Sequence, residues 1–145
     1  SNISRQYYFL EQIGMKKCEA LAHTVKSINP FIKAEFHDIR ITEDNVSELF
    51  GECDVIIEAL DRSSFKAMMF DAWQKHYHDK YDIGASGVGG YNDEPPLSIK
   101  KIGTKGFLVG DFMSESSDGL MATRVGIAAH MQANLAVKLL VEINA

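Results

Sequence analysis

The sequence contains little cysteine. Only two cysteines occur in 145 residues, Cys18 and Cys53, and they form no C-x-x-C pair. This excludes a disulfide framework and the usual structural zinc site, so no zinc is expected. Two free thiols suit a reducing compartment, and we expect a cytoplasmic protein.

Positive charge and long apolar runs are also scarce. The net charge is −5 and no basic block exceeds a pair of residues, which argues against a nucleic-acid partner. The longest apolar segment, near the C-terminus, is interrupted by His130, Gln132, Asn134 and Lys138. It is too polar to cross a bilayer and no signal-peptide pattern is visible, so no membrane partner is expected.

A dinucleotide-binding fingerprint is missing too. The glycine-rich run 87–90 follows a predicted strand but continues into the loop 92–96. A G-x-G-x-x-G motif must instead lead from a strand directly into a helix. This spacing disfavours a redox enzyme of the Rossmann type.

What the sequence does contain is an alternation of helix and strand patterns. With 46% hydrophobic residues, residues 1–145 can bury the core of a single domain. Short links between the elements are typical of an α/β fold, Rossmann-like, with a mostly parallel sheet, helices on both faces and a few antiparallel strands. The last helix is apolar on most sides, which predicts packing on the sheet plus a subunit contact. Besides the run discussed next, the patterns predict helices over 15–28, 45–50, 64–77 and 123–143 and strands over 31–38, 81–86, 97–101 and 106–112.

The stretch 53–64 is the first candidate for a functional centre. Its apolar run is typical of a central strand that is buried on both faces of a sheet. Ligands of parallel sheets bind beyond the carboxyl ends of the strands, where Glu58 and Asp61 fall. Two interpretations are open. In the first, the side chain of Asp61 or of Ser63 caps the next helix. In the second, Asp61 binds a ligand. Spacing alone favours the cap.

Two lysines, Lys16 and Lys17, stand in the first turn of the first predicted helix. Cations are disfavoured there by the helix dipole, so the pair needs an explanation. Free N–H groups together with lysines suit a phosphate-sized anion, and the alternative is a pair of solvated surface lysines. Combined with a carboxylate after a buried strand, this pattern suggests a nucleotide with a divalent metal.

Five segments, taken in order, resemble the ThiF/MoeB/HesA family of ATP-dependent activators of ubiquitin-like sulfur carriers. The residues Gly110 and Asp111 and the segment 119–126 look most like the second ThiF subfamily, which serves thiamine biosynthesis. The five segments are SNISRQ (1–6), GMKK (14–17), INP (28–30), DVIIEALD (54–61) and GLMA (119–122).

The resemblance implies ATP and Mg²⁺ as cofactors. Lys17 matches the phosphate-binding lysine of the family, and Asp61 matches the aspartate that serves the magnesium ion. With Arg5, these two are the implied catalytic residues. The residues implied in ATP binding are Asn2, Arg5, Gln6, Lys17, Leu60 and Asp61.

The resemblance also implies a partner and a reaction. Family members adenylate the C-terminal Gly-Gly carboxylate of a ThiS-like carrier with a ubiquitin fold and release pyrophosphate. Candidates for contacting the tail of that carrier are Asp111, Thr123 and Arg124. The family relationship further implies a homodimer.

Besides lacking C-x-x-C pairs, the chain departs from the family pattern in two respects. The N-terminal strand, the glycine-rich loop and the ribose-binding acidic residue are absent, so we expect residues 1–145 to be the C-terminal part of a ThiF-like adenylation domain, truncated at the N-terminus. The segment 113–124 resembles the crossover loop but has no cysteine, so a thioester or persulfide is not expected. The alternative is a non-catalytic module with the same fold that binds a carrier or a partner.

Overall fold

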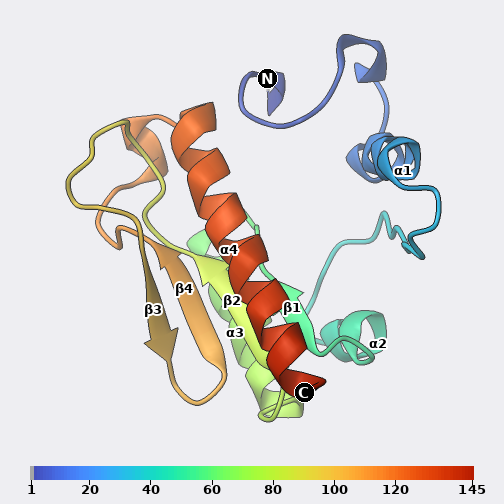
Figure 1. Cartoon of the computed structure of the whole chain (residues 1–145), viewed down its shortest axis with the longest axis vertical. Coiled ribbons are helices and arrows are strands. Elements are labelled where there is room, and N and C mark those ends of the chain that lie inside the picture. Colours follow the sequence, from blue (N-terminus) through green and yellow to red (C-terminus); the bar gives the residue numbers. More distant parts are fainter. Residues whose placement is uncertain (1) are drawn as a thin grey trace. The chain divides into compact units, whose positions relative to one another are not determined.

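The structure, a computed structural model, describes residues 2–145 (Figure 1). It falls into two compact units, one reaching to Arg40 and one running from Ile41 to Ala145. None of the helices in the described part of the chain is both long enough and apolar enough to span a membrane.

The first unit consists of two 3₁₀ turns and one helix. The turns are η1 (Asn2–Ser4) and η2 (Leu10–Gln12), and the helix is α1 (Lys17–Ile28), close to the predicted bounds. The buried Gln12 joins them: its amide nitrogen donates to the carbonyl of Ala20 at 3.1 Å and to Thr24 at 3.0 Å. A buried amide with its partners satisfied fixes the turn against the helix.

The strand predicted over 31–38 is wrong. These residues are irregular, and the part of the first unit that the structure describes contains no strand. Alternation of apolar and polar residues gives a chain a strand-like pattern, but a strand also needs a hydrogen-bonded neighbour. No such neighbour is present for this segment within its unit, so its backbone stays unpaired with any sheet.

The second unit is built on a four-stranded sheet. Its helices are α2 (Val46–Phe50), α3 (Ser63–His76) and α4 (Ala122–Ile143), with a 3₁₀ turn η3 (Ser116–Asp118). Its strands are β1 (Val55–Ile57), β2 (Tyr81–Ala85), β3 (Ser98–Ile102) and β4 (Gly106–Gly110). The strand order is β1-β2-β4-β3, with β2 parallel to both of its neighbours and β3 antiparallel to β4. The Rossmann-like, mostly parallel sheet is thus confirmed.

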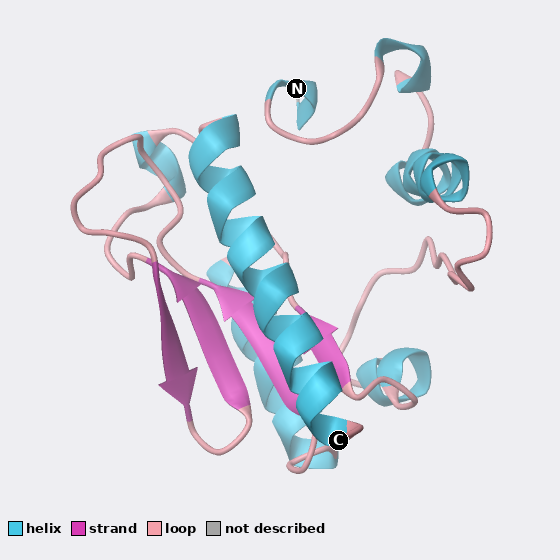
Figure 2. Cartoon of the chain, in the orientation of Figure 1, coloured by secondary structure: helices cyan, strands magenta, loops and turns pink. Residues whose placement is uncertain are grey.

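Helices cover both faces of this sheet, α4 on one and α3 on the other (Figures 1 and 2). On the first face, Ile83 and Val109 of the sheet pack with Leu135 of α4 and its neighbours. On the second face, Ile56 of β1 packs with Trp73 of α3. Helices therefore bury apolar residues on both faces of the sheet, as the apolar patterns of a parallel sheet require.

Two expectations about the sheet need correction. The stretch after Asp54 does not form the central strand: β1 lies at one edge of the sheet, and Ile57 is 44% exposed. An apolar run indicates burial but not which strands lie beside it, and here β2 takes the central place. The last strand, β4, is not a purely antiparallel addition, because it also pairs in parallel with β2.

The long helix α4 is not buried on most sides. Ala128, Leu135 and Leu139 face the sheet, whereas Val137 and Val141 are 60% and 63% exposed. A helix lying on a sheet contacts it along one stripe, so the apolar residues on the outer side have no partner within the described part of the unit. The predicted subunit contact is untested.

The close approach of two backbones at the end of β4 gives a first prediction. A Cβ added at Gly110 would lie 1.7 Å from the carbonyl oxygen of Ser86, and the φ of this glycine is +154°. Gly110→Ala should therefore destabilise the fold by roughly 3 kcal/mol or more, measured by urea unfolding. Gly103→Ala is the matched control, since Gly103 has φ +57° and no atom near its added Cβ, and it should cost only about 1 kcal/mol. Equal losses in both variants would contradict the close approach.

Candidate functional site

The carboxyl ends of β1 and β2 lie side by side because the two strands are parallel. The loop 58–62 leaves β1 at this edge and leads into α3, and the loop after Ala85 leaves β2. In open parallel sheets, ligands bind outside this edge. The candidate site is therefore built from the loop 58–62 and the start of α3.

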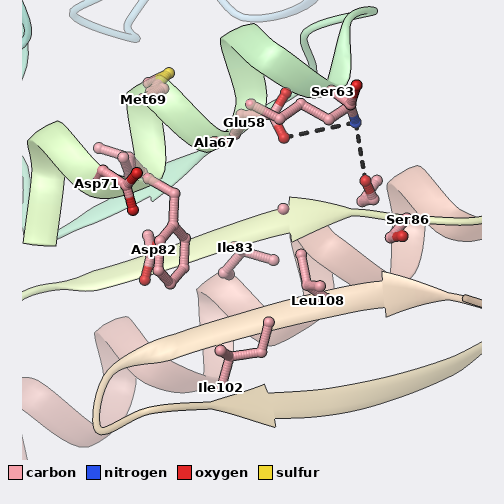
Figure 3. Close-up of a pocket in the computed structure, with 15 residues that line it drawn as sticks. Glu58, Ser63, Ala67, Met69, Asp71, Asp82, Ile83, Ser86, Ile102 and Leu108 are labelled. Carbon is pink, nitrogen blue, oxygen red and sulfur yellow. Dashed lines mark hydrogen bonds and ion pairs between the residues drawn. The ribbon is translucent and has the colours of Figure 1, made fainter. Parts of the chain in front are cut away.

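Glu58 organises this loop (Figure 3). Its side chain is buried, and one carboxylate oxygen accepts a hydrogen bond from the backbone N–H of Leu60. The other oxygen lies 3.6 Å from the ammonium nitrogen of Lys66 on α3. Lys66 in turn donates to the carbonyl of Ala85 at 2.8 Å, so one lysine ties the helix to the ends of both strands.

The charge of Glu58 is compensated in place. Burial raises the pKa of Glu58 above its ordinary value, while the Lys66 ammonium and the Leu60 amide oppose that shift. A carboxylate engaged in this way is poorly placed to bind a ligand. Glu58 thus holds the backbone that presents the next residues, Leu60 and Asp61.

Asp61 is exposed, and among residues 2–145 its carboxylate has no hydrogen-bond or ion-pair partner. Helix α3 is capped at Arg62 without any side-chain hydrogen bond, so neither Asp61 nor Ser63 caps it. The capping role that spacing favoured is wrong. A free carboxylate at the carboxyl edge of a parallel sheet fits a ligand for Mg²⁺ that also binds phosphate oxygens and water.

No protein-only metal cage accompanies it. In the described chain, no three His, Cys, Asp or Glu side chains come together. Magnesium in nucleotide sites needs only one or two carboxylates, because the phosphates and water supply the other ligands. The single Asp61 therefore fits magnesium held with a nucleotide better than a metal held by the protein alone.

In the first unit the structure brings Gln6 and Lys17 together. Lys17 is the first residue of α1 and donates to the Gln6 side-chain oxygen at 3.1 Å. Lys16 instead pairs with Asp38 at 2.5 Å, and the hydrogen bond and charge of Asp38 raise the pKa of Lys16. The pair of lysines is therefore divided, and Lys17 is the one left for an anion.

Two other predicted residues of this unit, Asn2 and Arg5, lie in and directly after the turn η1. Gln6 follows them in the chain, so the three occupy one short stretch. Arg5 is half-buried. Each predicted ATP-binding residue thus lies in one of two local groups, one on η1 and α1 and the other after β1.

Asp111 and Arg124 form a second cluster in the second unit. Their side chains are 1% and 11% exposed, and they make an ion pair of 2.7 Å. Asp111 also accepts hydrogen bonds from the backbone N–H groups of Met113 and Ser114, each at 2.8 Å, and from the Ser114 hydroxyl. Arg124 donates to the carbonyls of Asn92 and Pro95. This ion pair joins two loops to the start of α4.

The pKa of Asp111 shows how firmly the cluster is held. Burial disfavours its charged form, but the hydrogen bonds from Ser114, Met113 and Arg124 outweigh burial and hold the pKa of Asp111 well below its ordinary value. Thr123, the third predicted carrier-tail residue, is exposed beside Arg124. A hollow of about 280 Å³ adjoins the cluster, lined by Gly89, Gly90, Asn92, Glu94, Pro95, Asp111, Met113, Ser114, Asp118 and Arg124.

Sequence reasoning missed Lys66 and identified Glu58 only as a carboxylate at the carboxyl end of a strand, without its structural role. The two residues are eight positions apart across a strand-to-helix turn, where no periodic rule pairs them. The one available signal was a lysine in the first turn of α3, on the side that meets the sheet. Its partner could be identified only from the fold.

A mostly parallel sheet with helices on both faces and polar side chains after its strands defines a Rossmann-like α/β protein. The chain belongs to the ThiF family, whose family model matches residues 1–145. This confirms the resemblance carried by the five ordered segments.

Two relatives are each similar to about half of this chain. The adenylyltransferase and sulfurtransferase UBA4 of Lodderomyces elongisporus is 29% identical over 72 residues, covering 49% of this chain and 16% of that protein. A sulfur carrier protein adenylyltransferase of Thermus thermophilus is 27% identical over 73 residues, covering 50% of this chain and 27% of that protein. The chain therefore spans well under a third of the length of these relatives.

A solved structure matches almost the whole fold. The E. coli tRNA N6-threonylcarbamoyladenosine dehydratase TcdA, in complex with AMP, has a TM-score of 0.83 at 17% identity. The match covers 99% of this chain and 72% of that one. At this level of identity the likeness shows the fold alone.

The Asp111–Arg124 ion pair makes the stability of the fold dependent on pH. A carboxyl group with a lowered pKa stabilises the fold above its unfolded-state pKa of about 4, and this stabilisation is lost as the pH falls towards the folded-state value. Asp111→Asn should therefore lower the free energy of unfolding at pH 7 by about 3 kcal/mol, with a smaller difference at pH 3.

The measurement is urea unfolding at both pH values, with Asp93→Asn as the control. Asp93 is an exposed residue of the loop 92–96 that takes no part in the cluster. Its substitution should change the stability by less than about 0.5 kcal/mol. If Asp111→Asn lowers the free energy of unfolding by the same amount at pH 7 and at pH 3, the result would contradict the charged role of Asp111.

Proposed function

We propose that this chain is the adenylation part of an ATP-dependent adenylyltransferase. Its substrate is the C-terminal Gly-Gly carboxylate of a ThiS-like sulfur carrier with a ubiquitin fold, in thiamine biosynthesis. The observation that carries this proposal is membership of the ThiF family across residues 1–145. The names of the relatives, adenylyltransferases of sulfur carriers among them, support the same reaction class.

The proposed roles follow the two local groups of residues. Arg5 and Lys17, with Asn2 and Gln6 beside them, bind the phosphates of ATP, because cationic side chains at a helix start suit phosphate oxygens. After β1, Leu60 lines the nucleotide and Asp61 ligates Mg²⁺. The bound magnesium ion supplies charge neutralisation on the phosphates.

The chemistry needs charge compensation more than proton transfer. A carboxylate oxygen of the carrier bonds to the α-phosphorus of ATP, the bond from that phosphorus to the bridging oxygen breaks, and pyrophosphate leaves. Both reactants are anions, so cations must hold them together and stabilise the charge that gathers on the leaving group. The carrier carboxylate is already ionised, and no general base is required.

The Asp111–Arg124 cluster is proposed to shape the path of the carrier tail. Asp111 accepts hydrogen bonds from Ser114 and Arg124, and Arg124 also donates to the carbonyl of Pro95, so the two side chains set the position of the loops 87–95 and 111–118. The exposed Thr123 is then the residue of the three that meets the tail itself. A homodimer, which we also propose from the family relationship, would use the exposed apolar side of α4.

A non-catalytic module that binds a carrier is the second candidate, favoured by the absence of a cysteine from the segment 113–124, which resembles the crossover loop. ATP–pyrophosphate exchange separates the two. It is measured with a Gly-Gly-ended carrier, using this chain and a longer protein that carries the upstream glycine-rich segment of the family. Carrier-dependent exchange in the longer protein is expected, and its absence there would sink the adenylation proposal.

Within the active protein, Asp61→Asn should lower exchange at least about 100-fold, because one charge on the metal side is removed. Asp54→Asn is the matched control: Asp54 is an exposed carboxylate at the other end of β1 and should leave the rate within about twofold. Circular dichroism verifies that both variants are folded. Full exchange activity in the Asp61→Asn variant would contradict the proposed role of Asp61 as a ligand of Mg²⁺.

A second pair of variants tests the phosphate role. Lys17→Ala should also lower exchange at least about 100-fold, since Lys17 stands at the start of α1. Lys26→Ala, in the last turn of the same helix, is its control and should change the rate little. If both lysine variants behave alike, Lys17 is a surface lysine and not a ligand of ATP.

A further inference from the structure

A cavity of about 340 Å³ lies between α3 and the sheet (Figure 3). It exists because β2 places a glycine and an aspartate, Gly84 and Asp82, on the face that meets α3. Gly84 fills no space there, and an added Cβ would lie 2.8 Å from Leu108 of β4. The walls are mostly apolar, from Ile56, Met69, Phe70, Ile83, Ile102 and Leu108.

Asp82 is the unusual group in this wall. The residue is only 3% exposed. One carboxylate oxygen accepts a hydrogen bond from the Gln74 side chain at 2.9 Å, while the other has no partner in the described part of the chain. A buried polar group without a partner is rare in folded proteins and costs stability.

The charges around the cavity do not cancel. Glu58 at one end is paired with Lys66, which also bonds to Ala85. Asp82 lies at the other end near Asp71, away from Glu58 (Figure 3). Burial raises the pKa of Asp82 to about 6, opposed by the hydrogen bond from Gln74, so the group is still mostly ionised at neutral pH. The Asp82 end therefore carries uncompensated negative charge beside apolar walls.

We propose that this cavity is a binding site for a small organic cation, a primary amine with an apolar body. The ammonium group pairs with the Asp82 carboxylate, and the body fills the space that Gly84 leaves open. A metal ion fits poorly, because no three His, Cys, Asp or Glu side chains come together in residues 2–145. Mostly apolar walls with a small number of fixed polar groups are typical of sites for small amphipathic ligands.

The cavity shares Glu58, Ser63 and Lys66 with the candidate site, but none of these three has a proposed role in binding ATP or Mg²⁺. Asp61 and Leu60 are absent from the residues that line the cavity. The proposal therefore goes beyond the proposed function and stands or fails on binding alone. Its test needs neither ATP nor a carrier.

The probes are 2-phenylethylamine and its neutral counterpart 2-phenylethanol, titrated into the full chain. Binding is followed by the NMR signals of methyl groups in the cavity wall, such as those of Met69 and Leu108. The amine should bind at least about tenfold more tightly than the alcohol, since only the amine compensates the buried charge. Equal affinity of the two probes, or no binding of either, would overturn the proposal.

Variants locate the site. Asp82→Asn should abolish the preference for the amine, whereas Asp71→Asn, at an exposed carboxylate of the same end, should change it less than about threefold. Ala67→Leu fills the cavity from an exposed position of α3 and should weaken both probes, which keeps the test decisive if Asp82→Asn fails to fold. An amine preference that survives both Asp82→Asn and Ala67→Leu would place binding elsewhere and contradict the proposal.

Discussion

The parallel pairing of β2 with a strand on each side is the constraint on which the second unit depends. Because β1 and β4 both run parallel to β2, their chains leave the sheet at the same edge. The loop 58–62 and the loop after Ala85 are thereby brought together. Glu58 and Lys66 fix the position of these loops, since their ion pair and hydrogen bonds connect the ends of β1 and β2 to α3.

Each carboxylate on this framework does a different task because its surroundings differ. Glu58 is buried with a cation and holds backbone. Asp111 is buried with a full set of donors and joins loops. Asp82 is buried, and only one of its two carboxylate oxygens accepts a hydrogen bond. Asp61 is exposed, and its carboxylate has no hydrogen-bond donor in the described residues. Residue type alone does not distinguish these four, whereas burial and partners do. This difference in surroundings is why we propose Asp61 as a metal ligand and Asp82 as the partner of a cationic ligand.

Local periodicity was enough to predict most elements of the fold. The helices α1, α3 and α4 and the strand β2 appear within a few residues of their predicted bounds, because each has one apolar stripe or a short apolar run. The errors concern neighbours. The local sequence pattern does not show that the segment 31–38 lacks a neighbouring strand. It also does not show that β1 has a neighbouring strand on one side only. Likewise the pairs Glu58–Lys66 and Asp111–Arg124, and the cavity beside Gly84, arise from segments brought together by the fold, so no spacing rule could reveal them.

The outer strand β3 affects how copies of this protein can associate through the edge of the sheet. Its residues Ser98 to Lys101 are all exposed, and one side of its backbone has no strand beside it in the described sheet. Such an edge is a template onto which another chain can add, a first step towards aggregation. Here Lys100 and Lys101 stand on it, and a strand arriving alongside would have to strip water from both ammonium groups. These two lysines make extension of the sheet by a second copy unfavourable, so the edge discourages fibrous growth.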